Sequence, residues 1–248
     1  KTVTVALAND DMAEGLEQFH FRLSNASGAE IGRQRASILV LDEDDAPGST
    51  PTLAIKDAWV GEGDGFARFI VTLSAASTSA VTVTYSTSRG TTATNDHNSP
   101  SGTLTFAPGE IVKDIIVAVN HDIGTEPQII ENFFVNLANA TGAVLAPGTR
   151  ATGVIVDNDA PAQAMPNVDL LPGASTSVSE SAGWIDVPIY LAAPSAGMLR
   201  LDYSTRSGTA TEGRDFQAAS GSLTFLPGEM VQTARILLTD DQRFERNE

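Results

Sequence analysis

Carboxylates gather in short clusters along this 248-residue chain instead of being spread evenly. The clusters stand at the edges of apolar segments and just before proline-containing stretches. Converging carboxylates repel one another, and water screens that repulsion only in part, so a hard cation is their natural neutraliser. Ligation by oxygen alone favours Ca²⁺ over Zn²⁺. For any single carboxylate the alternative stays open that it is an ordinary turn residue.

The candidate metal ligands occupy corresponding places in three parts of the chain. This recurrence favours a shared kind of site over turn chemistry for the set as a whole. In the first part the candidates are Asp10, Asp11, Glu14, Glu17, Asp42, Glu43 and Asp44. In the second part they are Glu62, Asp122, Glu131, Asp157 and Asp159. In the third part they are Glu180, Asp240, Asp241, Glu245 and Glu248.

An internal repeat of domain size must position these carboxylates. The segment that begins at Tyr85 recurs at Tyr203, and the segment that begins at Gly102 recurs at Gly221. Another copy is present in part at the front, where residues 19–28 match residues 133–142. We therefore divide the chain into the tail of a first repeat (1–45), a linker (46–52), a complete second repeat (53–159), a linker (160–166) and the head of a third repeat (167–248).

The apolar residues of the second repeat alternate with period two, as in the segments 69–73 and 115–119. This spacing and the many β-branched residues are typical of strands. About seven such segments, and no convincing helix, predict an all-β fold of tandem immunoglobulin-like seven-strand β-sandwiches. In such a sandwich the turns after the first and fifth strands and the end of the last strand can meet at one pole.

Several motifs in fixed order carry a family resemblance. Residues 203–216 read Tyr-x-Thr-x-x-Gly-Thr-Ala-x-x-x-x-Asp-Phe, and a Gly-x-Leu-x-Phe-x-Pro-Gly-Glu motif follows at residues 221–229. An acidic turn follows at residues 240–248, and the family's terminal acidic motif stands at residues 156–159, before a linker. Over nearly the whole chain this order resembles the Calx-beta family. The resemblance implies a seven-strand sandwich of Calx-beta type that binds Ca²⁺ at the pole facing the next domain.

The resemblance also implies roles for single residues. The family's early Glu corresponds to Glu62 and Glu180, and its terminal acidic triplet corresponds to residues 42–44 and 157–159. The chain departs from the family where Arg89 replaces an Asp before Gly-Thr, as Ser207 does in the third repeat. A guanidinium forks well onto paired carboxylate oxygens, so Arg89 offers a way to neutralise the pole without metal.

Composition excludes several classes of function. Asp and Glu number 31 against 15 Lys and Arg, and the net charge of −16 argues against nucleic acid and membrane-surface partners. There is no cysteine, and catalytic motifs built on histidine or on a glycine loop are missing, so we expect no enzyme. We expect His20, His97 and His121 to be solvated, and Trp59 and Trp184 to lie in a core or an interface.

These observations predict a calcium-binding, extracellular or cell-surface array for structure or adhesion, in which Ca²⁺ stiffens the joints between neighbouring repeats. Cell-surface or assembly proteins are its expected further partners. One alternative is a metal-free structural or assembly module, and a weaker one is an accessory module of a secreted enzyme. The chain reads as part of something longer, either with flanking sequence that completes the outer repeats or with strand exchange between chains.

Overall fold

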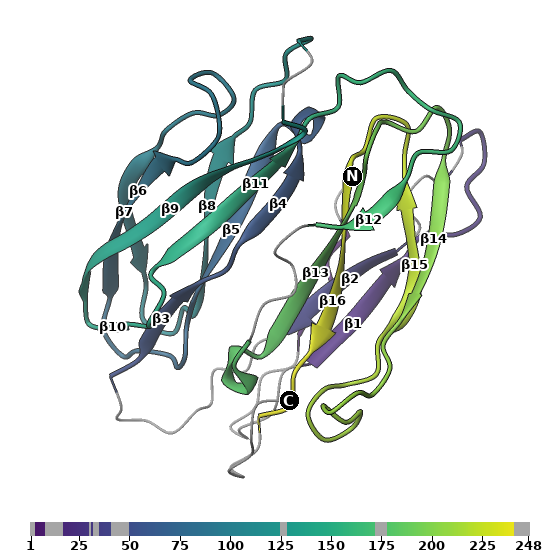
Figure 1. The fold of residues 1–248 in the computed structure, drawn as a ribbon. Helices are drawn as coiled ribbons and strands as arrows, with labels where there is room; N and C mark the ends of the chain where they lie inside the picture. Colours follow the sequence, from purple (N-terminus) through teal and green to yellow (C-terminus); the bar gives the residue numbers. More distant parts are fainter. Residues whose placement is uncertain are drawn as a thin grey trace.

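The computed structural model describes residues 3–7, 17–29, 31, 35–40, 50–124, 128–171 and 178–240. Within these residues the fold is all-β, with two short 3₁₀ turns, η1 (Glu62–Asp64) and η2 (Glu180–Ala182), and no α-helix (Figure 1). None of the helices in this part of the chain has the length and apolarity needed to cross a membrane. The predicted architecture of tandem β-sandwiches is confirmed.

The second repeat is a sandwich of two sheets around one core. One sheet has the strand order β10 (Val144–Leu145), β3 (Thr52–Ile55), β5 (Phe66–Leu73), β8 (Val112–Ala118). The other has the order β4 (Ala58–Gly61), β11 (Arg150–Val156), β9 (Ile130–Thr141), β6 (Val81–Arg89), β7 (Ser101–Phe106). Alternate side chains of both sheets point inward, as period-two strands require, and the fully buried ones include Phe69, Val71, Phe106, Phe133 and Val135.

The first extended segment of this repeat is divided between the two sheets, as β3 and β4. Strand β3 pairs antiparallel with β5, whereas β4 pairs in parallel with β11. The chain changes sheets at Lys56 and Asp57, where the Lys56 amide still bonds Ile70 O at 3.0 Å and Asp57 Oδ1 accepts the Thr152 amide at 2.7 Å. The change matters for the pole, because β4 then ends with Gly61 directly opposite Val156.

The recurring Tyr and Gly residues pack against each other across a pair of strands. Tyr85 lies opposite Gly102 in the ladder, and a Cβ on that glycine would stand 3.1 Å from the tyrosine ring. Tyr203 covers Gly221 in the same way, so the glycine admits a close aromatic neighbour in both repeats.

The Pro-Gly-Glu motif of residues 108–110 forms a tight turn. Gly109 has φ of +85°, Glu110 N bonds Ala107 O at 2.9 Å, and the Glu110 carboxylate accepts the Ala107 amide at 2.7 Å. Glu229 repeats both bonds with Leu226, at 2.9 and 2.8 Å. The glutamate of this motif therefore closes a turn and takes no part in the acidic pole.

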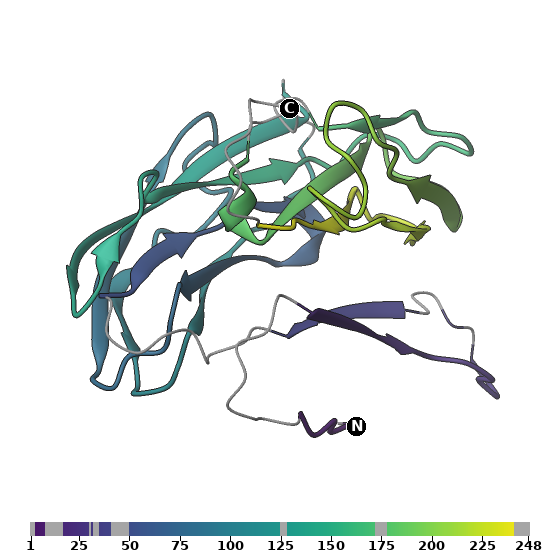
Figure 2. The same cartoon turned by 90° about the horizontal axis from the view of Figure 1, so that it is seen from below.

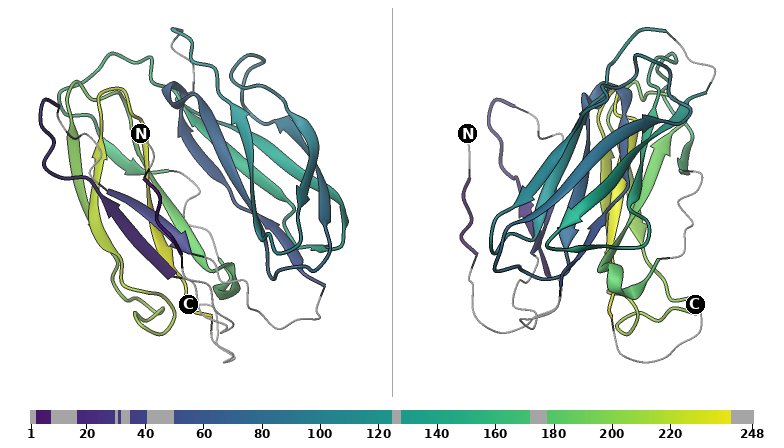
Figure 3. Two further views of the ribbon diagram at one scale, coloured as in Figure 1. Left: turned by 180° about the vertical axis from the view of Figure 1, so that it is seen from behind. Right: turned by 90° about the vertical axis from the view of Figure 1, so that its left-hand side faces the viewer.

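The third repeat contributes two sheets in its described part. One has the order β12 (Val168–Leu170), β13 (Trp184–Leu191), β16 (Val231–Leu237), and the other pairs β14 (Leu199–Ser204) with β15 (Ser220–Phe225). Strands β13 to β16 lie beside the second repeat in Figure 1 and in the view from behind in Figure 3. Strands β1 (Glu17–Arg22) and β2 (Arg35–Val40) of the first repeat form an antiparallel pair, which Figure 2 shows as a separate layer.

His97 differs from its expected solvated role. Its side chain is only 5% exposed and stacks on Phe133 with ring centroids 4.2 Å apart. Nε2 lies 3.2 Å from Thr92 Oγ1 and Nδ1 lies 2.6 Å from Asn98 O. His97 occupies the position that Phe216 holds in the third repeat, so it fills an aromatic place in the core.

Candidate metal centre

Three chain segments converge at one pole of the second repeat. Turn η1 follows β4, the turn at residues 120–124 follows β8, and residues 157–159 follow β11. The parallel β4–β11 ladder ends at Gly61 and Val156, so Glu62 and Asp157 leave the sheet side by side. On the other side of β11, Ile155 pairs with Glu131 near the start of β9. Strand pairing alone therefore brings carboxylates from distant segments to one edge.

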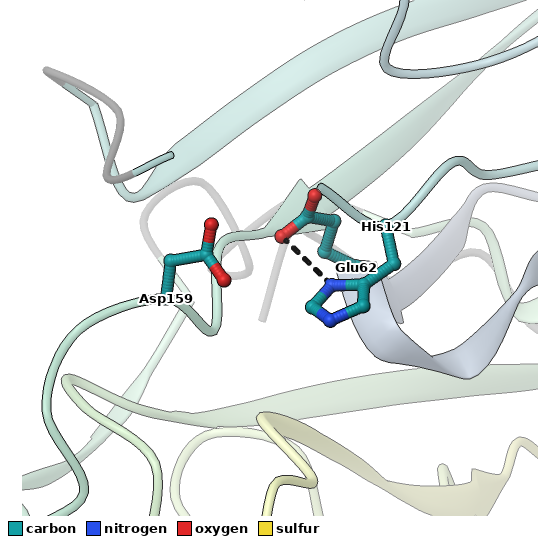
Figure 4. A group of neighbouring side chains, drawn as sticks. All are labelled: Glu62, His121 and Asp159. Atoms are coloured by element: carbon teal, nitrogen blue, oxygen red, sulfur yellow. Dashed lines mark ion pairs between the residues drawn. The ribbon is translucent and has the colours of Figure 1, made fainter. Parts of the chain in front are cut away.

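Glu62 stands at the centre of this pole. The residue is only 7% exposed, and its Oε1 accepts the backbone amide of Asp122 at 2.8 Å. Its Oε2 lies 3.6 Å from His121 Nδ1, within ion-pair range if the imidazole is protonated. Asp159 faces both groups (Figure 4), and one potential ligand atom from each of Glu62, His121 and Asp159 lies within 4.8 Å of the others.

Three buried oxygens at this pole accept no hydrogen bond from the described residues. They are Glu62 Oε2, Asn158 Oδ1 and Asp159 Oδ2. A buried acceptor without a donor costs free energy, and such groups in native proteins call for an ion or a water. Two carboxylates and one amide supply only oxygen, which fits a hard cation such as Ca²⁺. The residues present therefore fit the predicted metal.

The electrostatics of the pole point the same way. Burial raises the pKa of the Glu62 carboxyl, and the nearby charges of Asp159 and Asp122 raise it further, while the Asp122 amide and His121 act in the opposite direction. Burial also raises the pKa of Asp159, with the charge of Asp157 as the next cause. Both carboxyls are thus short of positive charge, which a cation would supply.

Two features of this pole were not predicted as part of the site. His121 was expected to be solvated, and although its side chain is 51% exposed, it lies against Glu62. Its place beside Asp122 in the acidic turn was the available signal. Gly63 admits the Asn158 amide, because a Cβ there would lie 2.7 Å from Asn158 Nδ2. In the sequence, the glycine directly after Glu62 could have indicated that another group packs closely there.

The structure places the predicted ligands unequally. At the second-repeat pole, Glu62, Asp122 and Asp159 are in mutual contact or close range, and Glu131 and Asp157 are buried beside them, 9% and 4% exposed. Glu17 begins β1 and is exposed, Glu180 begins η2, and Asp240 lies exposed beyond β16. Nine candidates lie outside the described residues: Asp10, Asp11, Glu14, Asp42, Glu43, Asp44, Asp241, Glu245 and Glu248.

Arg89 makes a different contact from the one that would neutralise the pole. Its Nη1 donates to Thr94 Oγ1 at 2.8 Å, in an exposed position. The adjoining Gly-Thr pair is tied to β9, since the amides of Gly90 and Thr91 both bond Asn132 O, at 3.1 and 2.9 Å. The described contacts of Arg89 thus hold the loop after β6 and do not include an ion pair with a carboxylate of the pole.

Comparison with known proteins places this chain in a family. The Calx-beta domain model matches residues 1–44, 48–159 and 171–248. Sodium/calcium exchanger 1 of Bos taurus is 31% identical over 190 residues, which cover 68% of this chain and 19% of the relative. Sodium/calcium exchanger 2 of Mus musculus is 31% identical over 185 residues, covering 67% and 19%.

Two solved structures are also similar. The CBD12 tandem from CALX1.2 gives a TM-score of 0.42 at 24% identity and covers 77% of this chain and 76% of that one. The apo-form Calx CBD1 domain gives a TM-score of 0.41 at 27% identity and covers 45% and 100%.

These relatives correct one expectation. The aligned segments belong to sodium/calcium exchangers and not to secreted or adhesive proteins, so the predicted extracellular or cell-surface location is wrong. The chain spans 19% of the length of these exchangers, so their activity as whole proteins does not transfer to it. The family model, in contrast, covers most of the chain in three consecutive matches. The chain belongs to the Calx-beta family.

Proposed function

We propose that this chain is a calcium-binding, non-catalytic module of a larger protein, divided into the three repeats defined above, and that the pole of the second repeat holds the ion. The observation that carries the proposal is the set of three buried oxygens without donors on Glu62, Asn158 and Asp159. The sodium/calcium exchangers among its relatives, and a similar structure described as calcium binding domain CBD12 of CALX1.1, agree with this chemistry.

The proposed ligands come from three segments. Glu62 and Asp159 supply carboxylate oxygens, and Asn158 supplies an amide oxygen, a donor type that Ca²⁺ accepts. Asp122, Glu131 and Asp157 complete the acidic surroundings. His121 offers nitrogen, which suits Ca²⁺ poorly, so it borders the ion without binding it.

The other two repeats carry the same kind of pole in this proposal. Their proposed ligands are the remaining predicted carboxylates, of which the structure describes Glu17, Glu180 and Asp240. Binding at the second pole would tie η1, the turn after β8 and the end of β11 to one ion. Because residues 157–159 lead into the linker at residues 160–166, the ion would also order the first residues of that linker.

A thermal melt of the intact chain tests the proposal. It is recorded in EDTA, in millimolar CaCl₂ and in MgCl₂ as the control for ionic strength and charge. An ion present at a hundred times its dissociation constant stabilises the folded state by about 2.7 kcal/mol, which is a shift of several degrees. We expect a rise that is selective for calcium. An identical melt in EDTA and in CaCl₂ would overturn the proposal.

Two variants assign the effect to this pole. Glu62→Gln and Asp159→Asn keep the side-chain shapes and remove one charge each, so both should lose most of the calcium-dependent shift. Asp114→Asn is the matched control, because Asp114 belongs to the same repeat but pairs with Arg68 at 3.2 Å on the outer face of β5 and β8. The control should keep the full shift. An equal loss of the calcium-dependent shift in all three variants would show that the ion does not bind specifically at this pole.

A metal-free structural or assembly module is the second candidate. The His121–Glu62 contact favours it, since a protonated imidazole 3.6 Å from the carboxylate supplies part of the missing positive charge. If His121→Gln lowers the melting temperature while calcium changes nothing, this candidate takes the place of the first.

A further inference from the structure

We infer that the third repeat is docked along the flank of the second by a cationic clamp centred on Lys56, and that this lateral joint holds with or without an ion at the pole. The inference does not rest on the proposed calcium site. Its contacts involve none of the acidic side chains of the second-repeat pole.

Lys56 reaches from the second repeat into the third. Its Nζ donates to Ala182 O at 2.8 Å and to Trp184 O at 3.3 Å, the carbonyls at the end of η2 and the start of β13. The same ammonium lies 4.4 Å from the centroid of the Trp184 ring. A lysine near the last carbonyls of a helical turn and over an indole face makes two favourable contacts at once.

Lys56 is also positioned by its own repeat. It stands where the chain leaves β3 for β4, and its backbone amide bonds Ile70 O at 3.0 Å. Burial lowers the pKa of its ammonium, while the charge of Asp186 acts in the opposite direction. Asp57 of its own repeat also raises this pKa, and Arg235 of the third repeat lowers it. The favourable contacts that the ammonium makes across the joint are the two carbonyls, the indole face and the charge of Asp186.

Trp184 is locked from within its own repeat. The Arg235 guanidinium lies 5.0 Å from the indole centroid and forms two 2.7 Å bonds to Asp186, and the indole Nε1 donates to Asp186 at 3.3 Å. A bidentate Arg–carboxylate pair of this kind is geometrically specific. The indole thus presents a fixed face to Lys56.

An internal comparison shows what the docking does. Trp184 is only 4% exposed, whereas Phe66, at the equivalent position of the second repeat, is 48% exposed. The two residues begin equivalent strands, β13 and β5. The strand position alone therefore does not bury this residue, and the contacts of Trp184 with Lys56 across the joint and with Arg235 within its own repeat accompany its burial.

Apolar packing extends the joint toward the pole. One cluster of buried residues joins Val156 of the second repeat to Leu191, Met230 and Val231 of the third, with Trp59 and Val154 packed against it. At Gly61 an added Cβ would lie 3.4 Å from Met230 Cβ. The linker is held as well, by hydrogen bonds of 2.8 Å from Gln163 N to Pro194 O and from Ala196 N to Gln163 O.

Distance measurement between two spin labels tests this lateral joint in the intact chain. The chain has no cysteine, so Thr105→Cys on β7 and Ser204→Cys on β14, both exposed, give one label in each repeat. We expect one narrow distance distribution in EDTA and the same distribution in CaCl₂. A broad distribution in EDTA that narrows only with calcium would overturn the inference and leave the calcium site standing.

Variants then assign the joint to Lys56. Lys56→Met keeps the apolar stem and removes the ammonium, so the narrow peak should be lost in both buffers. Trp184→Phe, which installs the residue type of position 66, should have the same effect. Lys113→Met is the control, because Lys113 pairs with Glu110 at 2.7 Å within the second repeat.

Circular dichroism of each variant separates loss of the joint from loss of the fold. If Lys56→Met and Trp184→Phe keep both the β-sheet spectrum and the narrow peak, the lateral joint does not depend on the clamp and the inference fails. A narrow peak in a chain that shows no calcium-dependent melt would remove the proposed function and keep the joint.

Discussion

At the scale of single residues, Glu62 determines how the acidic pole responds to protons and cations. Its carboxylate is buried, one oxygen accepts an amide and the other lies near an imidazole that is charged only when protonated. The negative charge of Asp159 raises the pKa of this carboxyl further. In the metal-free chain at neutral pH, this pole therefore works against folding, and protons and Ca²⁺ compete to relieve it.

The pH dependence of stability follows from Glu62. Its pKa is raised above the ordinary 4.5, so between 4.5 and the raised value the folded chain binds more protons than the unfolded chain. The metal-free protein should therefore gain stability as pH falls through that window. Above the window, Glu62 is fully ionised, and the whole destabilisation by its buried charge should be present. Urea unfolding in EDTA at several pH values should show a smaller gain for Glu62→Gln than for the parent.

At neutral pH the same substitution should stabilise the metal-free chain by on the order of 1 kcal/mol, because it removes a buried negative charge that lies beside those of Asp159 and Asp122. A lower stability of Glu62→Gln in EDTA at neutral pH would contradict this electrostatic account.

Gly153 is a second single position with a testable effect on stability, because the core leaves no room for a side chain there. A Cβ at this position would lie 2.4 Å from Phe133 Cζ and 2.8 Å from Phe69 Cζ, in the centre of the second-repeat core. Gly153→Ala should therefore cost about 1–3 kcal/mol in urea unfolding through overpacking. Gly197→Ala is the control, since nothing lies within 4 Å of its added Cβ and its φ is not positive. Equal stability of the two variants would mean that the core opens easily at β11.

At the scale of elements, turns do as much as strands to build the pole. The change of sheet between β3 and β4 sets Gly61 opposite Val156, and only this parallel pairing brings Glu62 beside the end of β11. The Pro-Gly-Glu turn at Gly109 connects β7 to β8, the strand that precedes the acidic turn at residues 120–124. The turn at Gly228 connects β15 to β16 in the same way in the third repeat. Ligand geometry therefore depends on backbone conformations some distance from the ligands.

The turn between β7 and β8 requires a positive φ at Gly109, and this requirement gives a testable prediction. Gly109 has φ of +85°, where an ordinary L-residue is strained, so Gly109→Ala should cost about 1–2 kcal/mol. Gly109→Asn should cost less, because Asn tolerates this region, as Asn139 does with φ of 52° in the same repeat. Equilibrium unfolding in urea compares the two variants. An order of stability with Ala above Asn would show that the turn relaxes.

Sequence patterns predicted the elements better than their exact surroundings. Period-two segments located the strands of the second repeat, since alternation reports directly which face is buried. The split of the first strand was not predicted, because the sheet change at Lys56 depends on partners as distant as Thr152. The burial of His97 follows from its stacking on Phe133, a contact that local polarity conceals. The joint at Trp184 was foreseen only as a core or interface position.

At the scale of the whole molecule, two kinds of contact meet at the junction of the second and third repeats. The acidic pole lies where β11 enters the linker, and the Lys56 clamp lies at the far end of β4, beyond Trp59 and Val60. An ion would order the turns of the pole, whereas the clamp and the apolar cluster around Val156 set how the repeats lie against each other. Ordering of the pole and docking of the two repeats thus depend on residues at opposite ends of β4.

Hydrogen exchange can measure that separation over the intact chain. Calcium should slow exchange at the backbone amides of residues 61–64, 120–124 and 157–159, because it ties these segments together and suppresses local opening. Amides of residues 184–186, in β13 beyond η2, should exchange at the same rate with and without calcium, since Lys56 and Trp184 already hold them. In Lys56→Met the second set should exchange faster while the calcium effect on the first set persists. Slower exchange at residues 184–186 on addition of calcium would instead show that the pole and the lateral joint form one coupled unit.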